Sequence, residues 1–181
     1  AIKLAACLNS LYSSGTADFA SSTPWYQTYV DYAQRNGILT RTFADYDAHA
    51  SRREFAAVLA GALPRGALQP INSIADGAIP DVSVSAENAD AIYQLYRAGV
   101  LTGSNGGRFK PNDPIRRSEV AAIITRMAVP SLRQSVTLDT DKPAENVLSA
   151  DEILAKCGPA VFKLTSYDAR GNLLGMGSGV V

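Results

Sequence analysis

The sequence has few residues of the kinds that build metal sites, disulfide frameworks and histidine-dependent active sites. Its 181 residues include two cysteines, Cys7 and Cys157, and a single histidine, His49. A structural zinc site takes about four clustered cysteine or histidine ligands, so we expect no metal ion or other cofactor. Two cysteines do not make a disulfide framework, and we interpret them as small thiols that are at least partly buried.

The sequence also lacks a charge surplus and a long hydrophobic run. It has 17 basic and 17 acidic residues, which argues against a dedicated nucleic-acid binder, because such proteins carry excess positive charge. No run approaches the roughly 18 apolar residues that span a bilayer. The hydrophobic share of 46% is that of an ordinary globular protein. We therefore expect a folded chain with no nucleic-acid partner and no membrane span, and nothing in the pattern indicates an oligomeric state.

Two pairs of similar segments indicate an internal repeat. Each first segment ends in a glycine followed by two aliphatic residues and a threonine, and each second segment carries basic residues, a glutamate and an apolar run. The first pair is 25–40 and 88–102, and the second pair is 51–59 and 116–124. The later unit is slightly longer, as expected for an insertion in a loop.

Each unit is predicted to be a helix, a loop and a second helix. In the later unit, Ala91, Ile92, Leu95 and Tyr96 recur at helical spacing, and Gly99 follows where a left-handed residue ends a helix. Ser51 and Glu54 have the spacing of a capping box, which predicts a helix start. Pro64 and Pro130 are expected to follow the ends of the second helices, because proline has no amide proton to donate.

The chain opens inside an amphipathic pattern, and residues 1–12 resemble the second helix of an earlier unit. We therefore expect an excised piece of a longer protein, with part of a first unit at 1–17, a second at 18–66 and a third at 67–130. The predicted fold class is mainly α, with tandem helix-loop-helix units packed as a bundle, because one such unit cannot bury its apolar face alone.

The texture changes after Pro130. Residues 131–148 are polar and aperiodic, which predicts an exposed linker. A short helix is expected at 149–155, followed by strands at 161–167 and 173–181 with a turn at 168–172 between them. We expect a short, incomplete β segment there.

The repeat motifs resemble those of S-layer homology repeats. The family pattern has an Asp-Val opening, a tryptophan early in helix one, a Gly-Ile or Gly-Val end, a Phe-x-Pro loop and a Thr-Arg-Ala-Glu start to helix two. The last unit offers matching residues at 80–82, 99–100, 109–111 and 115–119, and the middle unit at Trp25, 37–38, Phe43 and 51–54. Three departures stand out: Glu87 replaces the tryptophan of the last unit, Arg116 replaces the usual threonine cap, and the loop after Phe43 lacks its proline.

The resemblance implies retention on the bacterial cell surface through anionic, pyruvylated cell-wall polysaccharide bound between repeats. Arginine suits a carboxylate on a sugar because its planar donors pair with both oxygens. Arg52 and Arg117 stand just inside helix starts, where free amides and the helix dipole also favour an anion. Trp25 offers a flat ring to a sugar. We expect the polysaccharide site to include Trp25, Arg52, Asp81 and Arg117.

Each of these residues also has a purely structural interpretation. Trp25 could pack between helices, and Arg52 and Arg117 could form ion pairs that tie neighbouring units together. Asp81 could cap the helix that follows it. Arg53 and Arg116 are expected to be solvated, and His49 to be an exposed loop residue.

Residues 149–181 resemble the start of a trypsin-like protease domain of the HtrA type, through the helix, first strand and Gly-Ser-Gly strand at 175–181. The resemblance implies an alternative, in which the chain is a fragment of a surface-anchored serine protease. The sequence itself has no catalytic triad, because no histidine follows Pro130. Ser178 does not fit a nucleophile elbow, because Met176 stands two positions before it, where that motif has glycine. We therefore expect no enzyme activity from this chain.

Overall fold

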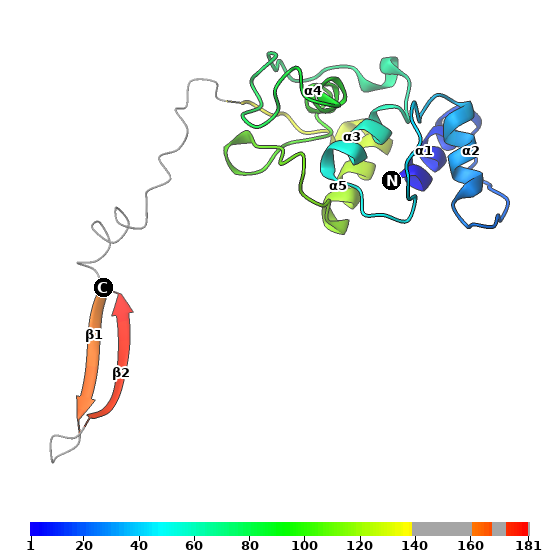
Figure 1. Ribbon diagram of the computed structural model, residues 1–181. Helices are drawn as coiled ribbons and strands as arrows, with labels where there is room; N and C mark the ends of the chain where they lie inside the picture. The colour runs from blue at the N-terminus through cyan, green and yellow to red at the C-terminus, as the bar shows by residue number, and fades with distance from the viewer. Residues whose placement is uncertain (139–160, 168–172, 181) are drawn as a thin grey trace. The chain divides into compact units, whose positions relative to one another are not determined.

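The computed structural model describes residues 1–138, 161–167 and 173–180, and the chain divides into a unit at Ala1–Asp141 and another at Lys142–Val181 (Figure 1). Within the described part, the first unit is built from α-helices and short 3-10 turns. The helices are α1 Ile2–Ser14, α2 Gln27–Arg35, α3 Arg52–Ala60, α4 Ala89–Arg97 and α5 Arg117–Ala128, and the turns are η1 Arg65–Leu68, η2 Asn105–Gly107 and η3 Pro130–Leu132. The predicted mainly α class is confirmed.

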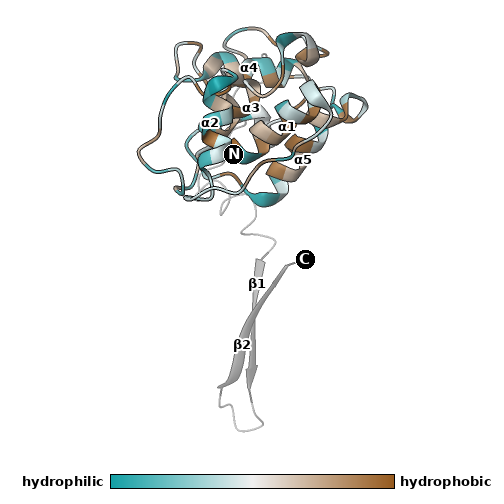
Figure 2. Ribbon diagram, turned by 90° about the vertical axis from the view of Figure 1, so that its right-hand side faces the viewer, coloured by the Kyte–Doolittle hydropathy of each residue, from teal (hydrophilic) through white to brown (hydrophobic). Residues whose placement is uncertain are grey.

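The helices pack pairwise around one hydrophobic core. Helix α1 packs against α2 and α3, while α3 also packs against α4. Figure 2 shows hydrophobic residues along α1, α3 and α5, which lie close together in that view. The largest fully buried side chains come mainly from α3, α4 and the loops around α4: Leu59, Ile79, Ile92, Leu95, Tyr96, Val100 and Phe109.

The first helices of the middle and last repeat units, α2 and α4, end in the same way, which is the structural counterpart of the sequence repeat. Gly37 after α2 and Gly99 after α4 have φ values of +68° and +71°, a region where a side chain is strained. Beyond each glycine the next two amides turn back to one helix carbonyl. Ile38 and Leu39 donate to Ala33, and Val100 and Leu101 donate to Leu95. The predicted role of Gly99 is confirmed.

The buried face of α4 differs slightly from the predicted one. Ile92, Leu95 and Tyr96 are fully buried as expected, but Ala91 is only half-buried. Tyr93 takes its place in the core, because its hydroxyl donates to the Val82 carbonyl at 3.0 Å and accepts from the Gly77 amide, also at 3.0 Å. Because its hydroxyl group is hydrogen-bonded, the tyrosine ring can be buried at a position where helical periodicity alone favours burying the neighbouring alanine.

The segment after α5 also differs from the prediction. The linker was expected at 131–148, yet residues 133–138 pack on the helical unit. Asn72 is buried and bridges this segment to α4: its Nδ2 donates to the carbonyls of Tyr96 and Gln134, and its Oδ1 accepts from the Val136 amide at 2.9 Å. Arg133 adds a hydrogen bond to the Ala67 carbonyl at 2.8 Å. One buried asparagine thus holds a stretch that has no periodicity of its own.

The second unit contains an antiparallel hairpin of β1 Val161–Tyr167 and β2 Leu173–Val180, with Val161 opposite Val180 and an irregularity between Ser166 and Tyr167. Both predicted strands form. The predicted linker at 139–148, the helix at 149–155, Cys157 and the turn at 168–172 lie outside the described residues. Cys7 is a half-buried free thiol on α1, as expected.

Candidate functional site

The start of α3 is fixed against the loop that precedes α5. Ser51 forms an antiparallel bridge with Pro114, the Arg52 amide donates to the Asp113 carbonyl at 2.9 Å, and the Arg53 amide donates to the Pro111 carbonyl at 3.0 Å. The predicted capping box is present. Glu54 accepts from the Ser51 amide at 2.9 Å, and the Ser51 hydroxyl accepts from the Glu54 amide at 3.4 Å. The amides of the first turn of α3 are therefore already occupied.

Arg52 lies between the middle and the last repeat units. Its Nε donates to the Phe109 carbonyl at 2.6 Å, its guanidinium stacks over the Phe109 ring with its central carbon 5.1 Å from the ring centre, and it pairs with Glu119 of α5. The side chain is only 11% exposed. These contacts fit the structural interpretation of Arg52, in which an ion pair ties neighbouring repeat units together.

Asp81 holds the same loop from the other side. Its two carboxylate oxygens accept from the amides of Phe109 and Lys110, each at 2.8 Å. This contact explains how Lys110 is kept at a φ of +59°, since two charge-assisted hydrogen bonds fix the backbone there. Asp81 therefore acts on the loop and not as a cap of the next helix.

Arg117 is exposed on the first turn of α5, and no hydrogen bond or ion pair of its side chain is found among the described residues. Arg116 occupies the cap position. Its amide donates to Glu119 at 3.0 Å, but arginine has no acceptor to return, so only half of a capping box forms. Burial raises the pKa of Glu119. Hydrogen bonds from Arg116 and Arg52 outweigh this effect and hold the pKa below its usual value.

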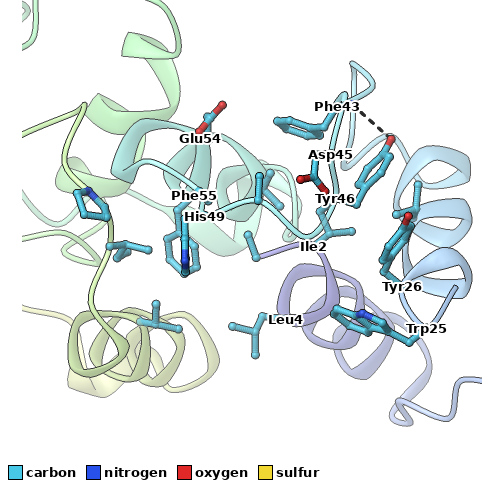
Figure 3. Close-up of a pocket in the computed structure, with 18 residues that line it drawn as sticks. Ile2, Leu4, Trp25, Tyr26, Phe43, Asp45, Tyr46, His49, Glu54 and Phe55 are labelled. Atoms are coloured by element: carbon cyan, nitrogen blue, oxygen red, sulfur yellow. Dashed lines mark hydrogen bonds between the residues drawn. The ribbon is translucent and has the colours of Figure 1, made fainter.

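Trp25 lies at the edge of a cavity of about 300 Å³ that is lined mainly by aromatic and aliphatic side chains (Figure 3). It is 57% exposed, its ring meets Tyr26 edge-on with the ring centres 5.8 Å apart, and its Nε1 donates to Asp47 at 3.2 Å. Tyr26 stacks on Tyr46 with the ring centres 5.4 Å apart. A half-open aromatic wall of this kind can hold a flat apolar face such as that of a sugar ring.

Two carboxylates and an imidazole are among the polar groups that line this cavity. Asp45, His49 and Glu54 line it together with the aromatic side chains, and Figure 3 shows them on the α3 side and on the loop before α3. Hydrogen bonds from Ser51 hold the pKa of Glu54 below its usual value, so it is a carboxylate at neutral pH. His49 is exposed, as predicted. Carboxylates and an imidazole suit the hydroxyl groups of a sugar.

The four predicted site residues do not meet at one point. Arg52 and Asp81 converge on Phe109, and neither lines the cavity at Trp25. Arg117 belongs to the same helix start as Glu119, but no contact joins it to Trp25.

A cluster of arginine and glutamate side chains that was not predicted from the sequence lies between the middle and the last repeat units. Glu87 pairs with Arg41 and with Arg53, and Arg41 also contacts Glu54 at 3.4 Å. Arg53 was predicted to be solvated, but its amide and side chain are both engaged. The one signal in the sequence was the glutamate at position 87, where the repeat pattern has a tryptophan.

Comparison with known families matches residues 78–121 to the S-layer homology domain. This stretch is thus similar to an S-layer homology domain. The matched stretch runs from just before Asp81, through α4 and the loop at Phe109, to the first turns of α5. The S-layer homology domain supports a cell-surface role in cell-wall anchoring, and it is the stretch that holds Asp81 and Arg117.

Searches among curated proteins and among solved structures returned no match. Among the described residues, no helix has the length and hydrophobicity to cross a membrane.

Proposed function

We propose that this chain anchors its protein to the bacterial cell wall, outside the cell, by binding anionic, pyruvylated secondary cell-wall polysaccharide. The match of residues 78–121 to the S-layer homology domain carries this proposal. The exposed ring of Trp25 at the cavity edge supports it, because the apolar face of a sugar ring can pack on such a surface.

The predicted residues divide into two roles in this proposal. Trp25 and Arg117 have exposed groups and contact the polysaccharide directly, the ring by stacking and the guanidinium by pairing with a ketal carboxylate. Arg52 and Asp81 act as positioning residues, since their charges are already used to hold the loop at Phe109. Their part is to keep the neighbouring helix starts at a fixed spacing. No catalytic step is assigned to any of these residues.

The serine protease alternative rests on the resemblance of residues 149–181 alone. The β1–β2 hairpin agrees with the predicted strand order, but a two-stranded hairpin is common to many folds, so it favours no catalytic function.

Co-sedimentation of the full chain with cell-wall sacculi tests the anchoring proposal, before and after mild acid removal of pyruvyl ketals. We expect binding that falls at least about tenfold on acid treatment and in Trp25→Ala, and several-fold in Arg117→Ala, since central aromatic and arginine contacts are each worth more than about 1 kcal/mol. Matched controls are Tyr12→Ala, an aromatic ring that is 58% exposed on α1 away from the cavity, and Arg108→Ala. Absence of binding by the folded wild type, or equal losses in the controls, would refute the proposal.

A further inference from the structure

Three charged side chains meet where the middle and last units join. Arg41 comes from the loop after α2, Arg53 from the first turn of α3, and Glu87 from the segment just before α4. The two oxygens of Glu87 are divided between the arginines: Oε1 pairs with Arg41, and Oε2 lies 3.7 Å from Arg53. One carboxylate thus serves two guanidinium groups.

Glu54 brings a second carboxylate to the cluster, and its contact with Arg41 is long. Its Oε1 lies 3.4 Å from Arg41, while its Oε2 accepts from the amide and the hydroxyl of Ser51, the latter at 2.7 Å. The Nε of Arg53 is buried, and within residues 1–138 it finds no hydrogen-bond acceptor. Both side chains are nevertheless partly exposed, 44% for Arg41 and 39% for Arg53, so the outer donors of the two guanidinium groups can meet a further oxygen next to Glu87.

The backbone and an aromatic ring hold both arginines in place. The Arg53 amide donates to the Pro111 carbonyl at 3.0 Å. The Arg41 guanidinium lies over the Phe43 ring, with its central carbon 5.0 Å from the ring centre. A guanidinium that stacks on a ring keeps its donor edge free for a carboxylate. Two guanidinium groups held near each other form a binding site for one carboxylate, whether the carboxylate comes from the chain or from a ligand.

We propose that Arg41 and Arg53 form a carboxylate-binding site that Glu87 occupies from within the chain, and that an acidic sugar binds there by displacing Glu87. Glu87 is the displaceable partner because its side chain is 47% exposed and its two ion pairs are surface pairs, which are individually weak. Binding in the natural chain is an exchange, and its affinity is reduced by the internal competitor.

The location favours a sugar as the carrier of the carboxylate. Phe43 and Glu54 belong to the arginine cluster and also line the aromatic cavity at Trp25, so the two places share a wall. A sugar ring in the cavity can present an acidic substituent to Arg41. This inference deepens the proposed function and rests on it only for the choice of a saccharide as ligand.

Isothermal titration of the full chain with methyl β-glucuronide, a soluble acidic sugar, tests the exchange. We expect weak binding by the wild type and a gain of about two- to thirtyfold in Glu87→Gln, the range expected when two exposed ion pairs no longer compete. The methyl ester of the same sugar, which has no charge, should bind both proteins equally. Asp90→Asn is the matched control, because it removes one exposed negative charge from α4 itself, outside the cluster.

The site assignment is tested by the double variants Glu87→Gln/Arg53→Gln and Glu87→Gln/Arg41→Gln, in which the gain should disappear. An equal gain in Asp90→Asn, a gain for the ester, or no gain in folded Glu87→Gln would overturn the proposal. A measurement on the wild type guards against misfolded variants: the acidic sugar should shift the backbone amide resonances of Arg41, Arg53 and Glu87, and their insensitivity would also overturn it. Because the ligand is soluble, failure to bind sacculi does not decide this result.

Discussion

Arg52 of α3 and Glu119 of α5 form an ion pair that joins the second helices of two successive units. The same guanidinium reaches the Phe109 carbonyl at 2.6 Å, so one side chain ties a helix start to both a loop and the next helix. Arg52 is largely buried, whereas Glu119 is partly exposed and also accepts from the Arg116 amide.

Replacement of Arg52 by alanine is expected to lower the free energy of unfolding by about 2–3 kcal/mol, since it removes the ion pair to Glu119 and leaves the Phe109 carbonyl without its charged donor. Arg117→Ala should change it by less than about 0.5 kcal/mol, because that side chain is exposed and has no partner among the described residues. Urea unfolding followed by helical circular dichroism measures both. Similar losses in the two variants would contradict the assigned roles.

The two helix starts offer a reciprocal test of capping. Ser51→Ala should destabilise the protein by about 1 kcal/mol, because the Glu54 amide loses its acceptor. Arg116→Ser should stabilise it by about 0.5–1 kcal/mol, because serine supplies the acceptor that arginine lacks at the start of α5. Thermal unfolding of both variants checks this, and a loss of stability in Arg116→Ser would mean that Arg116 has another structural role.

Stability is expected to fall in acid through Glu54 and Glu119. Both have a pKa below the ordinary value of 4.5, so the unfolded chain takes up protons on these groups more readily than the folded protein. Their contribution is complete above pH 4.5 and is lost as the pH falls through the folded pKa values. Urea midpoints measured against pH should show this decline, and it should be shallower in Glu54→Gln/Glu119→Gln. An unchanged slope in that variant would assign the acid sensitivity elsewhere.

Asn72→Ala is expected to detach the segment at 133–138 and to cost about 2–3 kcal/mol, because a buried amide with three hydrogen-bond contacts is lost. Hydrogen exchange should report loss of protection at the Val136 amide. Gln134→Ala is the control, because its side chain donates only to the nearby Leu132 carbonyl while its backbone keeps the contact to Asn72. Retained protection at Val136 in Asn72→Ala would show that packing alone holds the segment.

Features that depend on neighbours in the sequence were predictable. The box at Ser51 and Glu54, the left-handed Gly99, the end of α5 before Pro130 and the two strands follow from which residues stand within a few positions of one another. Local backbone conformation and capping need only such short-range contacts.

The candidate site was predicted only in part. The role predicted for Trp25 stays a prediction, to which the structure adds the cavity beside the ring. The cluster of Arg41, Arg53 and Glu87 was not foreseen, because nothing in the periodicity tells which surface charges from two units will meet.

The sequence by itself thus determined the helical repeat, the helix ends and the residues that carry the resemblance to the S-layer homology domain. Only the tertiary structure decided that Arg52 and Asp81 are used to hold the Phe109 loop, that Asn72 fixes residues 133–138, and that Glu87 fills the arginine pair. The reason is physical: these contacts join residues that are far apart in the chain, and their partners are set by how the units pack, whereas helix ends are set by hydrogen bonds within a single turn.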